Sequence, residues 1–190
     1  MTITKSLRQR IVLLSCAALA AACSSSSDGE GTPLDENAFG AKYKLADNEI
    51  PGWTQKTTTD AFLVYTDQTL TDKIDGAAVP YTDRKMRFAL VQELVGPDPQ
   101  NATFWAMDMT SEANAQSMAA HQKTTMSATI TIPGYDASVA IASEALTGIT
   151  VYAYFKALYL EIILDGFGQD RDAAAQTGVK FLQAEEAKTK

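Results

Sequence analysis

The chain has 190 residues, of which 46% are hydrophobic and 21% charged, a composition typical of a globular protein and unlike that of a collagen-like or wholly disordered chain. Its 16 basic and 23 acidic residues give a net charge of −7. This acidic balance disfavours binding to nucleic acid, because phosphate binding requires a basic face on the protein.

The first 22 residues are typical of an export signal. Lys5, Arg8 and Arg10 form a basic start, and an apolar stretch follows over residues 11–22. That stretch is shorter than the roughly 20 apolar residues that a transmembrane helix needs, but it fits the apolar region of a secretory signal. We therefore predict a signal peptide over residues 1–22.

The signal ends in the segment "LAAAC", whose last residue is Cys23. This segment resembles the lipobox of bacterial lipoproteins, in which a small residue precedes a Cys that is lipidated and becomes the new N-terminus. The common pattern has Leu three places before the Cys, whereas here that place holds Ala20 and Leu19 lies one place further back. The resemblance implies that the protein is anchored in a membrane through a lipid on Cys23.

Two other interpretations of the signal stay open. Lipidation of Cys16 would leave about four apolar residues after the basic start, fewer than a signal peptide needs. An ordinary signal peptide with an unmodified Cys23 is the other alternative. Both cysteines lie in the first 23 residues, so the rest of the chain has none to form a disulfide.

Residues 23–48 are predicted to be the lipidated Cys followed by a flexible tether, because "SSSSDGEGTPLDEN" is polar, acidic and rich in Ser and Gly. Ser24 follows the Cys directly, and the lipoprotein resemblance then implies a cell-envelope location, with sorting to the outer membrane of a Gram-negative bacterium. Removal of residues 1–22 would leave 13 basic and 23 acidic residues, a net charge of −10. That charge disfavours electrostatic adhesion to anionic lipid headgroups, so the lipid alone would hold the membrane.

Residues 49–188 are predicted to form one globular domain. Apolar alternation predicts strands over 61–66, 85–95, 102–109, 127–132, 137–142, 148–155 and 158–164. Helices are predicted over 68–76, 111–125 and 171–187, with Asp67, Thr110 or Ser111, and Asp170 as their caps. The close spacing of the strands predicts an α+β fold, in which helices pack on one side of a mostly antiparallel sheet.

Two patterns inside these elements include polar residues. In the strand over 85–95, Leu90 and Leu94 share one face, which Gln92 interrupts. In the last helix, Leu182 lies on the apolar stripe, whereas Glu185 is predicted to face water together with its acidic and basic neighbours.

Several short motifs of this sequence match a pattern that we associate with one protein family. They are Trp53; Leu70, Ile74, Asp75, Gly76, Ala78 and Tyr81 in "LTDKIDGAAVPY"; and Met107, Asp108, Met109, Ser111, Glu112 and Ala113 in "MDMTSEANAQSM". Together with the late segment "GITVYAYFKALYLEIIL", they make residues 51–182 similar to an uncharacterised family of secreted and lipid-anchored bacterial proteins. That family has no established activity, so the resemblance implies an envelope location and no catalytic residue.

The sequence offers little for catalysis or metal binding. One His, His121, is too few for a zinc protease site, and no Gly-x-Ser-x-Gly motif supports a Ser-His-Asp triad. The acids around "DGFGQDRD" do not match a calcium-binding EF-hand loop. Asp108 and Glu112 are the best candidates for a pair of catalytic carboxylates, although acids at helix starts are usually caps. We expect no metal and no cofactor.

The remaining candidates are the aromatic residues of the last two strands. Alternation places Tyr152 and Tyr154 on one face of their strand, and Tyr159 follows on the next strand. These tyrosines are expected either to pack within the sheet or to form an exposed surface for a ligand or partner. The sequence therefore favours a non-enzymatic envelope module that binds an envelope protein or a small ligand, and the alternative is a hydrolase of envelope polymers that uses acidic residues.

Overall fold

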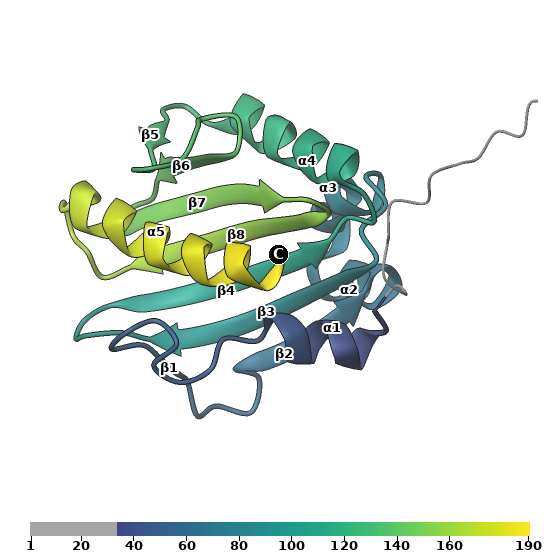
Figure 1. Ribbon diagram of the computed structural model, residues 1–190, viewed down its shortest axis with the longest axis horizontal. Helices are drawn as coiled ribbons and strands as arrows, with labels where there is room; N and C mark the ends of the chain where they lie inside the picture. Colours follow the sequence, from purple (N-terminus) through teal and green to yellow (C-terminus); the bar gives the residue numbers. More distant parts are fainter. Residues whose placement is uncertain (1–33) are drawn as a thin grey trace, which may run out of the picture. The chain divides into compact units, whose positions relative to one another are not determined.

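Within residues 34–190, which the computed structural model describes, the strands form one eight-stranded sheet (Figure 1). Every neighbouring pair is antiparallel, and the order across the sheet is β1-β3-β4-β8-β7-β6-β5. β1 and β2 both pair with the outer edge of β3. The strands are β1 (Thr54–Gln55), β2 (Phe62–Thr66), β3 (Phe88–Val95), β4 (Asn101–Asp108), β5 (Ile130–Thr131), β6 (Ala140–Glu144), β7 (Gly148–Phe155) and β8 (Leu158–Asp165).

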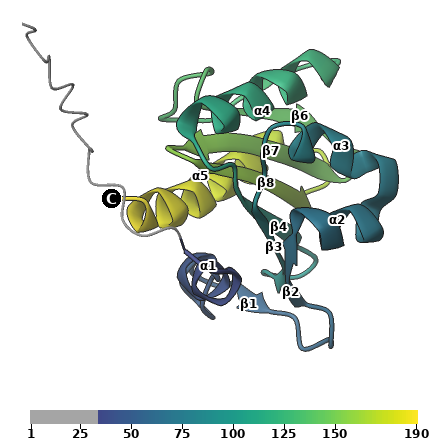
Figure 2. The ribbon, with the colours of Figure 1, turned by 90° about the vertical axis from the view of Figure 1, so that its right-hand side faces the viewer.

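The helices cover both faces of this sheet. Helix α1 (Glu36–Tyr43) and helix α5 (Arg171–Lys188) contribute to one core cluster, and α2 (Asp67–Ile74), the short helices η1 (Asp75–Ala78) and α3 (Val79–Thr82), and α4 (Glu112–Thr125) surround a second. Figure 2 shows the two sets on opposite sides of the sheet. The α+β class and the antiparallel sheet are as predicted, but the helices do not lie on one side only.

The two-sided burial follows from the composition of the central strand. β8 lies between β4 and β7, and along it Leu160, Ile162 and Leu164 belong to the first core cluster while Tyr159 belongs to the second. A strand that is apolar on both faces must be covered on both faces, because either uncovered face would expose a large apolar patch. The continuous apolar run of this strand is the sequence signal for a three-layer arrangement.

The segment predicted as a tether contains a helix that belongs to the domain. Helix α1 begins after Asp35, whose carboxylate accepts a hydrogen bond from the backbone N–H of Ala38 at 2.8 Å. Phe39 and Tyr43 of this helix and the following Leu45 are buried in the first core cluster. The tether prediction is therefore wrong for residues 34–48, because three apolar residues suffice to dock a segment of otherwise polar composition. Residues 24–33 of the predicted tether lie outside the described residues.

The side chain of Gln92 binds the segment after α1 to the sheet. Its side chain is fully buried in β3, where its amide donates to the carbonyl of Leu45 at 2.8 Å and accepts from the N–H of Leu45 at 2.9 Å. The polar residue that interrupts the apolar face of the predicted strand thus satisfies the backbone of a segment 47 residues away. A buried polar side chain of this kind is tolerated because both of its hydrogen-bonding groups have partners.

The three predicted helices match α2, α4 and α5 within two residues at each end, whereas α1, η1 and α3 were not predicted. Ser111 and Asp170 cap α4 and α5 as predicted. Helix α2 is capped by Thr66, which forms a reciprocal pair with Thr69, and Asp67 is already its first residue. Among residues 34–190, no helix has both the length and the apolar character that crossing a membrane would require.

Candidate binding site

Three side chains form a row across the middle of the sheet, on the face that α4 covers in part. Trp105 of β4 and Tyr152 of β7 both lie directly opposite Glu161 of β8, one on each side. All three side chains are half-buried. Directly opposite residues on adjacent strands have Cβ atoms roughly 5 Å apart, so the two aromatic side chains flank the carboxylate.

The row marks a border on this face of the sheet. On one side of it, Met107, Tyr159 and Tyr154 are buried in the core cluster beneath the helices. On the other side, Thr103, Thr150 and Ile163 remain partly exposed, and we call these three residues the open face. The three side chains of the row therefore lie at the edge of the part of the sheet that the helices cover, where solvent can still reach them.

Tyr81 contacts the middle residue of the row, Glu161. Its hydroxyl, on the short helix α3, donates a hydrogen bond to Oε2 of Glu161 at 3.1 Å. Its ring lies 6.5 Å from that of Tyr159, measured between centroids. We call Tyr81, Trp105, Tyr152, Tyr159 and Glu161 the Glu161 cluster.

The electrostatics of the Glu161 cluster are unusual in two respects. Burial raises the pKa of Glu161, and the hydrogen bond from Tyr81 offsets only part of that rise. Burial, together with the charge of Glu161, also raises the pKa values of the three tyrosines, so their hydroxyls keep their protons. The carboxylate is therefore surrounded by neutral side chains.

The hydroxyl of Tyr159 lacks a hydrogen-bond partner. Its side chain is 0% exposed, and its oxygen is fully buried. The side chain of Gln122 on α4 lies near this hydroxyl and lowers the Tyr159 pKa slightly, against the rise caused by burial. The geometry of the two groups is not that of a hydrogen bond. An unsatisfied buried hydroxyl costs free energy, and each such group in a native structure calls for an explanation.

The predicted tyrosines thus lie together, but they do not form an exposed surface. Tyr152 and Tyr154 share one face as predicted, and Tyr159 lies on that face too, directly opposite Tyr154. Tyr154 is 9% exposed and Tyr159 is fully buried, because α4 packs over them. Only Tyr152 reaches both the cluster and solvent.

Sequence reasoning missed Glu161, Tyr81 and Trp105 as members of one site. Tyr81 lies 80 residues before Glu161, so no local pattern relates them. One signal was available, since Glu161 is the single charged residue in the apolar run of β8. A charge in a strand that is apolar on both faces indicates either a buried pair or a functional group.

Asp108 and Glu112, the candidate pair of catalytic carboxylates, both make contacts that stabilise the fold. Oδ2 of Asp108 accepts from Nε of Arg87 at 2.9 Å and is also paired with the second nitrogen of that guanidinium, and Oδ1 accepts from the N–H of Thr110 at 2.8 Å. Glu112 is exposed in the first turn of α4, where a negative charge favours the helix. Both oxygens of Asp108 are occupied, so this carboxylate does not have the freedom that acid–base catalysis needs.

Glu185 is buried, contrary to the prediction that it faces water. Its side chain is 0% exposed, and Oε1 accepts from Nζ of Lys188 at 2.8 Å while Oε2 has no partner. Lys188 also pairs with Glu49 at 3.0 Å and donates to the carbonyl of Lys44 at 3.1 Å, so it joins α5 to the segment after α1. Burial raises the pKa of Glu185 to about 7.

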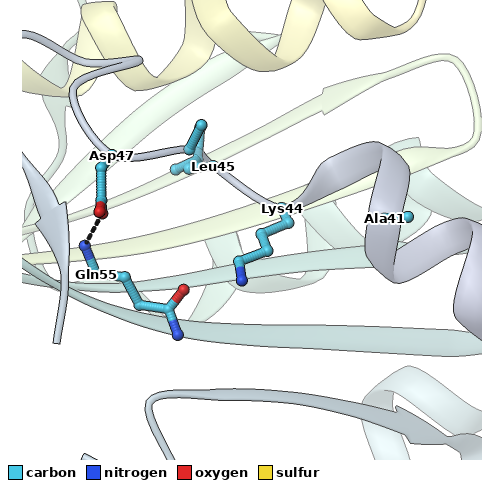
Figure 3. A pocket seen from close by; sticks show the side chains of 6 residues that line it. Ala41, Lys44, Leu45, Asp47 and Gln55 are labelled. Atoms are coloured by element: carbon cyan, nitrogen blue, oxygen red, sulfur yellow. Dashed lines mark hydrogen bonds between the residues drawn. The ribbon is translucent and has the colours of Figure 1, made fainter. Parts of the chain in front are cut away.

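A depression of about 360 Å³ lies where α1 approaches β1 (Figure 3). Its lining residues are Ala41, Lys44, Leu45, Ala46, Asp47 and Gln55. The polar groups there serve the fold: Asp47 accepts from the N–H of Gln55 at 2.8 Å, and Nζ of Lys44 lies 4.6 Å from the ring centroid of Phe62. Because no buried polar atom without a hydrogen-bond partner lines it, this depression is a weaker candidate than the Glu161 cluster.

Metal chemistry finds no support in the described part of the chain, where no group of three or more His, Cys, Asp or Glu side chains could hold an ion. Asp170 of the glycine-rich turn caps α5 by accepting from the N–H of Ala173 at 2.9 Å. Cys23, the predicted lipidation site, lies outside the described residues.

Comparison of the chain with models of known protein families, with curated proteins and with solved structures finds no match. The assignment of the site therefore rests on the geometry of this chain. Within that geometry, the motif residues Leu70, Ala78, Tyr81, Met107 and Met109 come from two distant segments and meet in the core cluster next to Glu161.

Proposed function

We propose that this chain is a lipid-anchored protein of the bacterial cell envelope whose domain binds a ligand at the Glu161 cluster. The Cys23 segment and its basic, apolar start support the anchor. One observation carries the binding role: a half-buried carboxylate without a basic partner lies between two aromatic side chains, where the helices end and the open face begins. A charged group that is partly sheltered and partly open to solvent in this way is available to a ligand.

A binding role also fits what the domain lacks at this position. Glu161 has one hydrogen-bonding neighbour, Tyr81, and no second acid or base among the described residues contacts it. Hydrolysis of a glycosidic polymer, in contrast, uses a pair of carboxyl groups on either side of the scissile bond. The single carboxylate among aromatic side chains is suited to recognition.

The binding role can be tested with a matched pair of variants. Thr150→Arg places a long charged side chain on the open face beside Tyr152, whereas Gln176→Arg adds the same side chain to the exposed surface of α5. The purified domain would be screened for thermal stabilisation against a panel of cationic, anionic and neutral small molecules. We expect at least one compound to stabilise the wild type and Gln176→Arg but not Thr150→Arg.

Absence of any stabilising compound, or equal stabilisation of both variants, would contradict binding at this face. The anchor is tested separately by fractionation of bacterial cells that produce the full chain. We expect the wild type in the membrane fraction and Cys23→Ala in the soluble fraction, because removal of the thiol removes the site of acylation. A membrane-bound Cys23→Ala protein would contradict the lipid anchor.

A further inference from the structure

We infer that the ligand of the Glu161 cluster is a small organic molecule bearing a primary ammonium group. This inference rests on the proposed function and specifies the chemistry of the same site. The juxtaposition that points to it is a carboxylate flanked by Trp105 and Tyr152, with one hydrogen bond from Tyr81 and the unpartnered hydroxyl of Tyr159 nearby.

The first argument concerns charge. Glu161 forms no salt bridge with any basic side chain of the described residues, and no Lys or Arg contributes to its pKa. Arg84, at the end of α3, is engaged by the carbonyl of Pro80 and the hydroxyl of Ser117. Partial burial disfavours a carboxylate charge that has no cation beside it, so a ligand cation would supply the partner that the fold omits.

The second argument concerns the surroundings of that charge. The faces of Trp and Tyr rings attract cations through their quadrupoles, and the attraction is stronger where water is excluded. Trp105 and Tyr152 lie on both sides of Glu161, and the Tyr81 hydroxyl contacts its carboxylate. An anion would meet the opposite arrangement, because the same rings and the carboxylate would repel it.

The third argument favours an ammonium that carries N–H groups over a quaternary one. An ionised carboxylate accepts at about four positions, of which Tyr81 uses one. N–H donors from a primary ammonium can satisfy such acceptors, and charge-assisted bonds to carboxylates are among the stronger hydrogen bonds in proteins. A quaternary ammonium has no donor for them.

The test uses the purified domain and n-butylammonium as the probe, with tetramethylammonium and butyrate as comparison ions. Fluorescence reports on the site because Trp105 lies in it, whereas the only other tryptophan, Trp53, is buried against Phe181 on the opposite face. We expect n-butylammonium to bind the wild type at least about tenfold more tightly than tetramethylammonium, and butyrate not to bind, because charge-assisted hydrogen bonds are worth at least that factor.

Glu161→Gln should weaken binding of n-butylammonium by about tenfold or more, since it removes the charge but keeps an oxygen for the Tyr81 hydroxyl. Glu185→Gln is the matched control, because it makes the same substitution at a glutamate that has no access to the Glu161 cluster: Glu185 is fully buried on α5, against the other face of the sheet. It should leave binding unchanged. Thermal unfolding of both variants is measured as a control. A cooperative transition like that of the wild type shows that a variant is folded, so a loss of binding is then not a loss of the fold.

Three results would overturn the inference: no binding of n-butylammonium to the wild type, equal binding by Glu161→Gln, or tighter binding of butyrate or tetramethylammonium. These results leave the proposed function standing if the panel described above yields an anionic or neutral compound that Thr150→Arg excludes. Failure of the whole panel would contradict both.

Discussion

Replacing Glu185 by Gln should change how the stability of the domain depends on pH. The carboxyl of Glu185 is fully buried, and burial raises its pKa from 4.5 to about 7 despite the attraction of Lys188. A carboxyl whose pKa is higher in the folded than in the unfolded chain binds its proton more tightly when folded. Its contribution to stability is therefore fully present below pH 4.5 and is lost as the pH rises through about 7.

The size of this contribution follows from the two pKa values. The difference between 4.5 and about 7 corresponds to about 3 kcal/mol of unfolding free energy. The Gln side chain resembles the protonated carboxyl in size and charge, so the variant lacks this pH-dependent loss. We expect Glu185→Gln to match the wild type within about 1 kcal/mol at low pH and to gain on it by about 3 kcal/mol at a pH above 7.

Urea denaturation of both proteins at several pH values across this window measures the effect. The difference between variant and wild type isolates Glu185, because the other carboxylates titrate alike in both proteins. A difference that stays constant with pH would show that Glu185 titrates at its ordinary pKa. A difference that grows in the opposite direction would show that the pair with Lys188 outweighs the burial of the charge.

Three further substitutions test contacts that hold the fold. Gln92→Ala removes both hydrogen bonds to the backbone of Leu45, so we expect a loss of about 2–3 kcal/mol and faster amide exchange in α1, measured by urea denaturation and hydrogen exchange. Asp108→Asn weakens the pairing with Arg87 and should cost about 1–3 kcal/mol while binding at the Glu161 cluster persists; an unchanged stability would refute this structural role. Ser111→Ala removes the N-cap of α4 and should cost about 1 kcal/mol, which thermal unfolding would register and which Ser111→Asp should restore.

Local patterns account for most of the secondary structure. Alternating β-branched and aromatic residues predict β7 and β8, and the structure places these strands at Gly148–Phe155 and Leu158–Asp165. The start of α5 follows from Asp170, whose side chain caps it in the structure as predicted. These features were predictable because each depends on residues only a few positions apart.

The candidate site depended on contacts that no local pattern contains. The hydrogen bond between Tyr81 and Glu161 joins residues 80 positions apart, and the flanking of Glu161 by Trp105 and Tyr152 depends on the register of three strands. The sequence nevertheless marks the positions involved. Glu161 and Gln92 each interrupt an apolar strand pattern, and Glu185 follows Phe181 and Leu182 at helical spacing on their buried stripe.

The sequence by itself determined the acidic charge and predicted the longer strands, the helices α2, α4 and α5 and the caps Ser111 and Asp170, because these features depend on composition and on short-range spacing. The export-type start with Cys23 stays a prediction from the sequence. Only the tertiary structure decided that the helices cover both faces, that α1 belongs to the domain, that Gln92 and Glu185 are buried and that Glu161 is half-buried. The physical reason is the same in each case. A polar side chain in an apolar pattern is buried or exposed according to the partners that distant segments bring to it, and those partners are set by strand register and helix packing.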